Sequence, residues 1–204
     1  MIDLSRLFFI FPGGSGGMFV KTIFYYYLKQ LGLYKERITL NKINLQTGDC
    51  HAYHYLNLFN GHFPEDVVNI RNTHPDSTII YIKFDADDIP LIVTLMYNKH
   101  FKFWIDENWE QAVKQWPELT NATTPADKEV AFFLNLTTKI DSNWGSVDLT
   151  KVDLVIDFKT VIGKDKKDLH QIIVDYLEIT RLPEVDRFID QYRSINEKYY
   201  NSRG

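Results

Sequence analysis

The sequence predicts an α/β fold of three layers, in which a mostly parallel central sheet is flanked by helices. Residues 7–11 form an uninterrupted apolar run that ends at a proline and a cluster of glycines, which is typical of a buried central strand. Residues 78–84 and 152–158 are two further runs rich in β-branched and aromatic residues. Segments of helical character separate these runs, and such alternation indicates parallel strands.

The remaining elements follow from periodicity and from helix-breaking residues. Helices are predicted over residues 18–31, 89–97, 108–116, 125–136, 166–177 and 184–199. Residues 66–71 predict another strand, and residues 37–40 a short one, while the rest of 34–62 stays unassigned. The acidic residues at 85–88 suit the N-terminus of the helix that follows, with Pro90 in its first turn. A chain of 204 residues fits one domain, 1–204.

Composition restricts the classes of function. The net charge of −4 argues against a protein that coats a nucleic acid polymer, because that role needs a positive surface. The single cysteine, Cys50, allows no intrachain disulfide and favours a reducing compartment. The apolar run at 7–11 is too short to span a bilayer, so a cytoplasmic protein without a membrane partner is predicted.

The loop between the first strand and the first helix carries the strongest functional signal. It reads Pro12 and then Gly13, Gly14, Ser15, Gly16 and Gly17, with four glycines in five positions. Glycines let backbone N–H groups converge, and at a helix N-terminus such groups bind anions. A tight turn without a ligand needs one or two glycines, so an anion-binding turn of the P-loop type is favoured over it.

Two well-known motifs are close to this loop. The ATPase and GTPase motif ends in Gly-Lys-Ser/Thr, whereas Met18 and Phe19 follow Gly17 here, which argues against either activity. Gly13-x-Ser15-x-Gly17 matches the nucleophile elbow of serine hydrolases, so a hydrolase that uses Ser15 is a minor alternative. Its late histidine would be His170, which lies in a helical pattern and is predicted to be a surface residue.

Taken in order, these segments resemble the sulfotransferase family, and above all the small sulfotransferase-like proteins of phages and marine microbes. The loop and its flanks, residues 11–19, are similar to the family's phosphosulfate loop. Thr73-His74 followed by Pro75 resembles a strand that ends in Thr-His-x-Pro. Residues 79–88 resemble the next strand and turn, and residues 155–158 with the helix 166–177 resemble a late strand and helix. The resemblance implies a P-loop NTPase-like fold.

The resemblance also implies a reaction and its residues. The donor would be 3′-phosphoadenosine-5′-phosphosulfate, and the acceptor a hydroxyl of a small molecule or carbohydrate. The base would be His74, and Lys21 and Arg71 would be nearby cations. The donor would be held by Gly13, Gly14, Ser15, Gly16, Gly17, Met18, Lys83 and Thr94.

The loop departs from the family at the positions that matter for chemistry. The family's loop lysine is replaced by Gly14, and its two threonines by Gly17 and Met18. A non-catalytic nucleotide- or anion-binding protein of the same fold is therefore the alternative. No metal is predicted, because His51-x-x-His54 lacks the four-residue spacing and the glutamate of the helical zinc motif, and capping explains the aspartates at 85–88.

Overall fold

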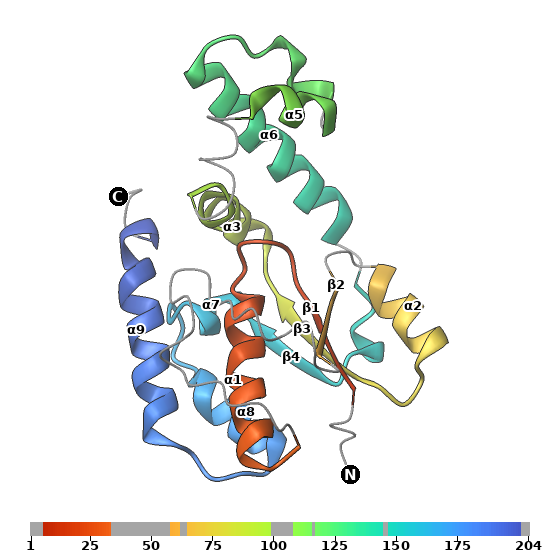
Figure 1. Cartoon of the computed structure of the whole chain (residues 1–204), viewed down its shortest axis with the longest axis vertical. Helices are drawn as coiled ribbons and strands as arrows, with labels where there is room; N and C mark the ends of the chain where they lie inside the picture. Colours follow the sequence, from red (N-terminus) through yellow and green to blue (C-terminus); the bar gives the residue numbers. More distant parts are fainter. Residues whose placement is uncertain are drawn as a thin grey trace.

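A computed structural model describes residues 6–33, 58–61, 65–98, 108–115, 117–144 and 147–200, and it is an α/β structure as predicted (Figure 1). Four parallel strands form one sheet in the order β2-β1-β3-β4. They are β1 (Leu7–Ile10), β2 (Leu58–Gly61), β3 (Thr78–Lys83) and β4 (Leu154–Asp157). Leu7 lies beside both Leu58 and Thr78, so β1 is an interior strand.

Helices cover the sheet and extend beyond its carboxyl edge. The α-helices of the described residues are α1 (Gly17–Gln30), α2 (Glu65–Thr73), α3 (Ile89–Met96), α5 (Trp109–Gln115), α6 (Pro125–Trp144), α7 (Phe158–Val161), α8 (Leu169–Leu177) and α9 (Pro183–Tyr200). Short 3₁₀ turns are η3 (Ala86–Asp88), η5 (Pro117–Asn121) and η6 (Leu149–Lys151). α3 packs against both α6 and α9.

The strand order explains why the sheet has helices on both faces. The chain moves from β1 to β2 in one direction and from β2 to β3 in the other. Because parallel crossovers are right-handed, α1 and α2 lie on opposite faces, as Figure 1 shows. α8 and α9 share the face of α1, since Phe24 contacts Tyr176 and Phe19 stacks on Tyr192 at 3.7 Å between ring centroids.

The strands β1 and β3 are largely apolar because helices cover both faces of the sheet. All four residues of β1 are buried, and five of the six residues of β3 are buried. A strand packed on both faces has no position for a polar side chain, which is why residues 7–11 and 78–84 were recognisable without alternation.

The predicted strand at residues 66–71 is wrong, because this segment lies in α2. Val67 is fully buried and Ile70 is 8% exposed, whereas Val68 is 38% exposed. Two buried positions that lie three residues apart, with an exposed position between them, are typical of one face of a helix. The valines and isoleucine favoured a strand by propensity, but packing of one helical face outweighed that preference.

Other predicted elements are confirmed with shifted ends. α6 runs to Trp144, well past the predicted end at 136, and the strand predicted over 152–158 is confined to β4 because Phe158 begins α7. β2 falls in the stretch that the sequence left unassigned. The short strand at 37–40, and His51, His54 and His62, lie outside the described residues.

Two classes of feature are absent from the part of the chain that the structure describes. None of its helices has both the length and the apolar character needed to cross a membrane. Within the same residues, no group of three or more histidine, cysteine, aspartate or glutamate side chains is arranged to hold a metal ion.

The stability of this fold is expected to fall as the pH rises from about 10 towards 12. Burial raises the pKa of Tyr81 from 10.0 to about 12, since its ring lies in the core parallel to that of Trp144. Above pH 10 the unfolded chain loses this phenolic proton while the folded chain keeps it, so the unfolded state gains stability. Urea unfolding of Tyr81→Phe should show a shallower alkaline decline than the wild type; equal slopes would contradict the assignment.

Candidate functional site

The glycine loop lies at the carboxyl edge of the sheet, between the end of β1 and the start of α1. The N–H group of Ser15 donates to the Pro12 carbonyl oxygen at 3.2 Å, and this bond closes the turn. The Gly16 carbonyl oxygen accepts from Val20 at 3.1 Å, so Gly16 is the N-cap of α1. The first-turn N–H groups of α1 therefore begin directly at the loop, where the positive end of the helix dipole lies.

Packing explains each of the four glycines. Gly14 and Gly16 have φ values of +81° and +78°, which side chains rarely adopt. A Cβ on Gly14 would overlap the Ile92 carbonyl oxygen of α3, and one on Gly16 would lie 2.8 Å from Val161 Cγ1. A Cβ on Gly17 would overlap the ring of Phe11, and one on Gly13 would lie 3.0 Å from the end of the Met96 side chain. The number of glycines is thus no longer an argument for a ligand.

Ser15 is committed to the loop itself. Its side chain is fully buried, and its hydroxyl donates to the Pro12 carbonyl oxygen at 2.8 Å. A hydroxyl that donates its proton to a backbone carbonyl is neither paired with a base nor presented to a substrate. This geometry does not support a nucleophilic role for Ser15.

The structure brings Lys83 to the same edge as the loop. Lys83 ends β3, the strand next to β1, and it lies beside Asp157 at the end of β4. Neighbouring charges there are paired: Lys159 contacts Asp85 at 3.1 Å and Asp88 at 3.7 Å, and Lys167 binds Asp157. The hydrogen bond that Lys159 donates to Asp85 raises the pKa of Lys159, which keeps that lysine charged.

Lys21 is a second cation close to the loop. It lies one turn into α1 and is only 3% exposed. A lysine buried to this degree makes polar contacts inside the protein, so its position alone does not assign it to a ligand. Lys21 lies nearer to the loop than any other lysine of α1.

Thr94 faces away from the loop, although its helix touches the loop. Ile92 and Met96 of α3 lie against Gly14. Thr94 is two residues from each of them, which is about 200° around the helix axis and therefore the opposite side. Its hydroxyl donates to the Pro90 carbonyl oxygen at 2.7 Å. The expected place of Thr94 in the donor site is not supported.

His74 lies at the opposite edge of the sheet from the loop. It follows α2 and precedes the start of β3, where its ring stacks on that of Phe8 and its Nδ1 accepts from Arg6 at 2.7 Å. Phe8 and Pro12 are separated by about 13 Å of extended strand. The helix at 65–73 causes this placement, because the resemblance required His74 to end a strand at the other edge.

Arg71 is a structural residue at that same opposite edge. Its guanidinium donates to the carbonyl oxygens of Lys151, at 2.8 Å, and of Ser77, and it forms an ion pair with Asp153. These bonds tie α2 to the segment that leads into β4. Arg71 is therefore removed from the cations expected near the loop.

His170 is buried, so its prediction as a surface residue is wrong. It has no exposed surface, because it lies between α1 and α9, where it contacts the Tyr27 hydroxyl and Asp186. Tyr27 lies near the C-terminal end of α1, whereas Ser15 precedes its start, so about 18 Å of helix separates Ser15 from the Tyr27 hydroxyl that His170 contacts. No Ser15–His170 pair is assembled.

The walls of the loop were not identified from the sequence. They are the Ile92 carbonyl oxygen and the Met96 side chain of α3, the Val161 side chain of α7 and the Tyr192 hydroxyl of α9. Their periodicity marked them as core residues but carried no information about which loop they would meet. Comparison with protein-family models, with curated proteins and with solved structures found no match to this chain.

Proposed function

We propose that this chain binds the phosphate groups of a nucleotide at the β1–α1 loop, as a non-catalytic domain of the P-loop type. The observation that carries this proposal is the position of the loop in the sheet. The strand order β2-β1-β3-β4 reverses direction between β1 and β3, and the loop leaves the carboxyl end of β1. In open parallel sheets, ligands bind outside the carboxyl ends of the strands at such a switch point.

Local electrostatics at the loop support an anionic ligand. The N-terminal end of α1 presents backbone N–H groups and the positive end of its dipole. The tight packing of Gly13 and Gly14 on α3 holds the loop rigid. A rigid loop binds an anion without a large loss of conformational entropy on binding.

A nucleotide with two separate phosphate sites fits best. Lys83 ends the strand next to β1, so it offers a second cationic group at the same edge as the loop. A ligand such as 3′-phosphoadenosine-5′-phosphosulfate, or 3′-phosphoadenosine 5′-phosphate, carries two anionic groups separated by its ribose. We assign the 5′ group to the loop and the 3′-phosphate to Lys83.

Sulfuryl transfer to a hydroxyl of a small molecule or carbohydrate is the second candidate function. This function is favoured because the loop follows β1 and Lys83 ends the neighbouring strand β3, so the two lie side by side as the family resemblance requires. It would need a base other than His74, which lies at the opposite edge. Binding is therefore proposed first, and transfer only as an addition to it.

Calorimetric titration with 3′-phosphoadenosine 5′-phosphate tests the proposed site. We expect saturable binding that weakens about tenfold or more in Lys83→Gln, because a charge-assisted contact to phosphate is lost. Adenosine, which lacks both phosphates, should bind far more weakly.

Three outcomes would overturn parts of this proposal. Absence of binding at millimolar ligand would exclude the site, and equal affinity in Lys83→Gln would exclude the role of Lys83. His74→Ala and Thr94→Val are matched controls, since both residues lie away from the loop. A loss of affinity in either control as large as in Lys83→Gln would contradict the geometry.

A further inference from the structure

A second candidate site lies at the other end of α1. An open pocket of about 580 Å³ is lined there by Tyr27, Gln30 and Leu31 of the α1 terminus, and by residues 178–180 and Leu182 between α8 and α9. α1 has 14 residues, so about 20 Å separate this pocket from the glycine loop. The pocket is therefore independent of the proposed phosphate site.

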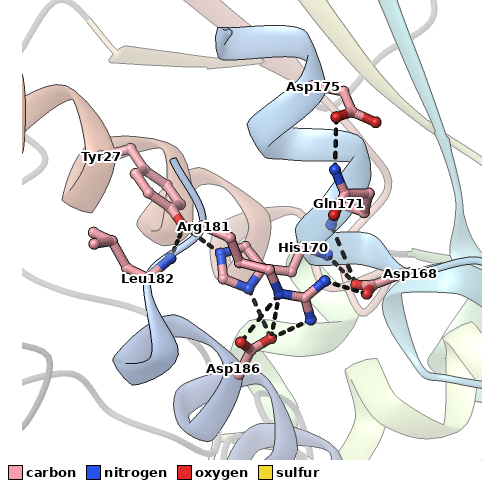
Figure 2. Close-up of polar contacts among 8 residues, drawn as sticks. All are labelled: Tyr27, Asp168, His170, Gln171, Asp175, Arg181, Leu182 and Asp186. Atoms are coloured by element: carbon pink, nitrogen blue, oxygen red, sulfur yellow. Dashed lines mark hydrogen bonds and ion pairs between the residues drawn. The ribbon is translucent and has the colours of Figure 1, made fainter. Parts of the chain in front are cut away.

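A buried hydrogen-bond network holds Tyr27, which lines the pocket and is only 2% exposed (Figure 2). The Asp186 carboxylate can only accept, so His170 Nδ1 donates to it at 2.7 Å and Nε2 accepts from the Tyr27 hydroxyl. Leu182 N–H donates to the same hydroxyl oxygen at 3.1 Å. Burial raises the pKa of Tyr27, which keeps the phenol protonated.

Arg181 supports the network and is fully occupied by it. Its guanidinium binds Asp186, with one contact at 3.1 Å, and also Asp168, the N-cap of α8. These hydrogen bonds hold the pKa of Asp186 below its usual value. Arg181 therefore does not neutralise other carboxylates around the pocket.

Glu178 is an unusual residue on the pocket rim. Among the described residues it is the non-glycine residue with a left-handed backbone, at φ +53° and ψ +45°. Glycine would remove a cost of about 1 kcal/mol at this helix end. No hydrogen bond or ion pair to its carboxylate occurs within the described chain, and its side chain is exposed. Within the described residues, the Glu178 carboxylate on the rim is therefore not tied up in an ion pair.

We propose that this pocket binds a small amphipathic cation, a primary ammonium group on an apolar body. The ammonium group donates to the Glu178 carboxylate, which accepts it at the rim of the pocket. The apolar body covers Leu31, which is 47% exposed, together with Ile179 and Leu182. Charge complementarity selects the cation, since Arg181, which lies between the lining residues Thr180 and Leu182 in the chain, is already paired with two carboxylates.

The test uses 2-phenylethylammonium as the probe and backbone amide shifts in NMR as the readout. We expect saturable shifts at Leu31, Thr180 and Leu182, with an affinity at least tenfold higher than for neutral 2-phenylethanol. Glu178→Gln keeps the size of the side chain and should weaken cation binding about tenfold. Glu129→Gln removes a carboxylate from exposed α6 and should leave the affinity unchanged.

Each contrary result overturns the proposal. Equal binding of the alcohol would show an apolar surface without charge selection, and equal affinity in Glu178→Gln would remove its counter-ion. Shifts confined to other parts of the molecule would place the probe elsewhere. Urea unfolding of each variant checks that the compared proteins are equally folded. A loss of affinity can then be attributed to the missing carboxylate and not to loss of folded protein.

Discussion

Replacing Gly14 by alanine is expected to lower the free energy of unfolding by roughly 2–5 kcal/mol. Two costs combine at this position. The backbone has φ +81°, which disfavours any residue with a Cβ by about 1–2 kcal/mol. The new methyl group would also overlap the Ile92 carbonyl oxygen and press on the Met96 backbone nitrogen at 3.0 Å. Backbone atoms of a helix cannot move aside as a flexible side chain can, so α3 or the loop must shift.

Gly32→Ala is the matched control for this prediction. Gly32 has nearly the same backbone conformation, with φ +75°, but no atom lies within 4 Å of the position that a Cβ would occupy there. It should lose only the conformational cost, about 1 kcal/mol. Urea unfolding of both variants isolates the overlap with α3 as the difference between them. Equal losses would show that the loop does not lie against α3 as described.

This pair of variants also decides how the glycine loop should be interpreted. A large loss of stability in Gly14→Ala would follow from packing alone, with no ligand present. The loop's role in binding is then carried by the edge of the sheet on which it lies and by its neighbour Lys83, not by its glycine content. Variants for binding studies should for this reason be made at Lys83 and not in the loop.

The elements that the sequence predicted well are those with an unambiguous pattern. β1 and β3 are apolar on both faces. α3 begins at Ile89 with Pro90 in its first turn, after a capping arrangement in which Asp88 accepts from the Asp85 N–H group at 2.9 Å. α2 was predicted wrongly because the pattern of these six residues, rich in valine and isoleucine, is compatible both with a strand and with a helix that buries one face. Val68, exposed on the solvent side, was the residue that distinguished the two.

The candidate site depended on information that local patterns do not contain. The loop follows β1 and Lys83 ends β3, so both lie at the carboxyl edge of the sheet because each belongs to a recognisable parallel strand. His74 was misplaced once its segment was taken for a strand, since a strand and a helix deliver their last residue to opposite edges of the sheet. His170 was misjudged because its acidic and phenolic partners, Asp186 and Tyr27, are 16 and 143 positions away.

Replacing His170 by alanine is expected to cost about 3 kcal/mol of stability, within a range of roughly 2–5 kcal/mol. The side chain is fully buried, so its removal leaves a cavity between α1 and α9. It also leaves the Tyr27 hydroxyl without its acceptor, and takes one donor from Asp186. Gln171→Ala is the control on the same helix, since that side chain is exposed and bonds only Asp175 there; its effect should stay within about 0.5 kcal/mol.

A double-mutant cycle with Tyr27→Phe tests whether the loss comes from the network. Tyr27 and His170 are in contact, so their effects should not add, with a coupling of about 0.5–3 kcal/mol. Additive effects, or a loss in His170→Ala no larger than in Gln171→Ala, would contradict a buried Tyr27–His170–Asp186 network. Affinity for 3′-phosphoadenosine 5′-phosphate should stay unchanged in folded His170→Ala, because the length of α1 separates the network from the loop. A stability loss without an affinity loss would show that the two ends of α1 act independently.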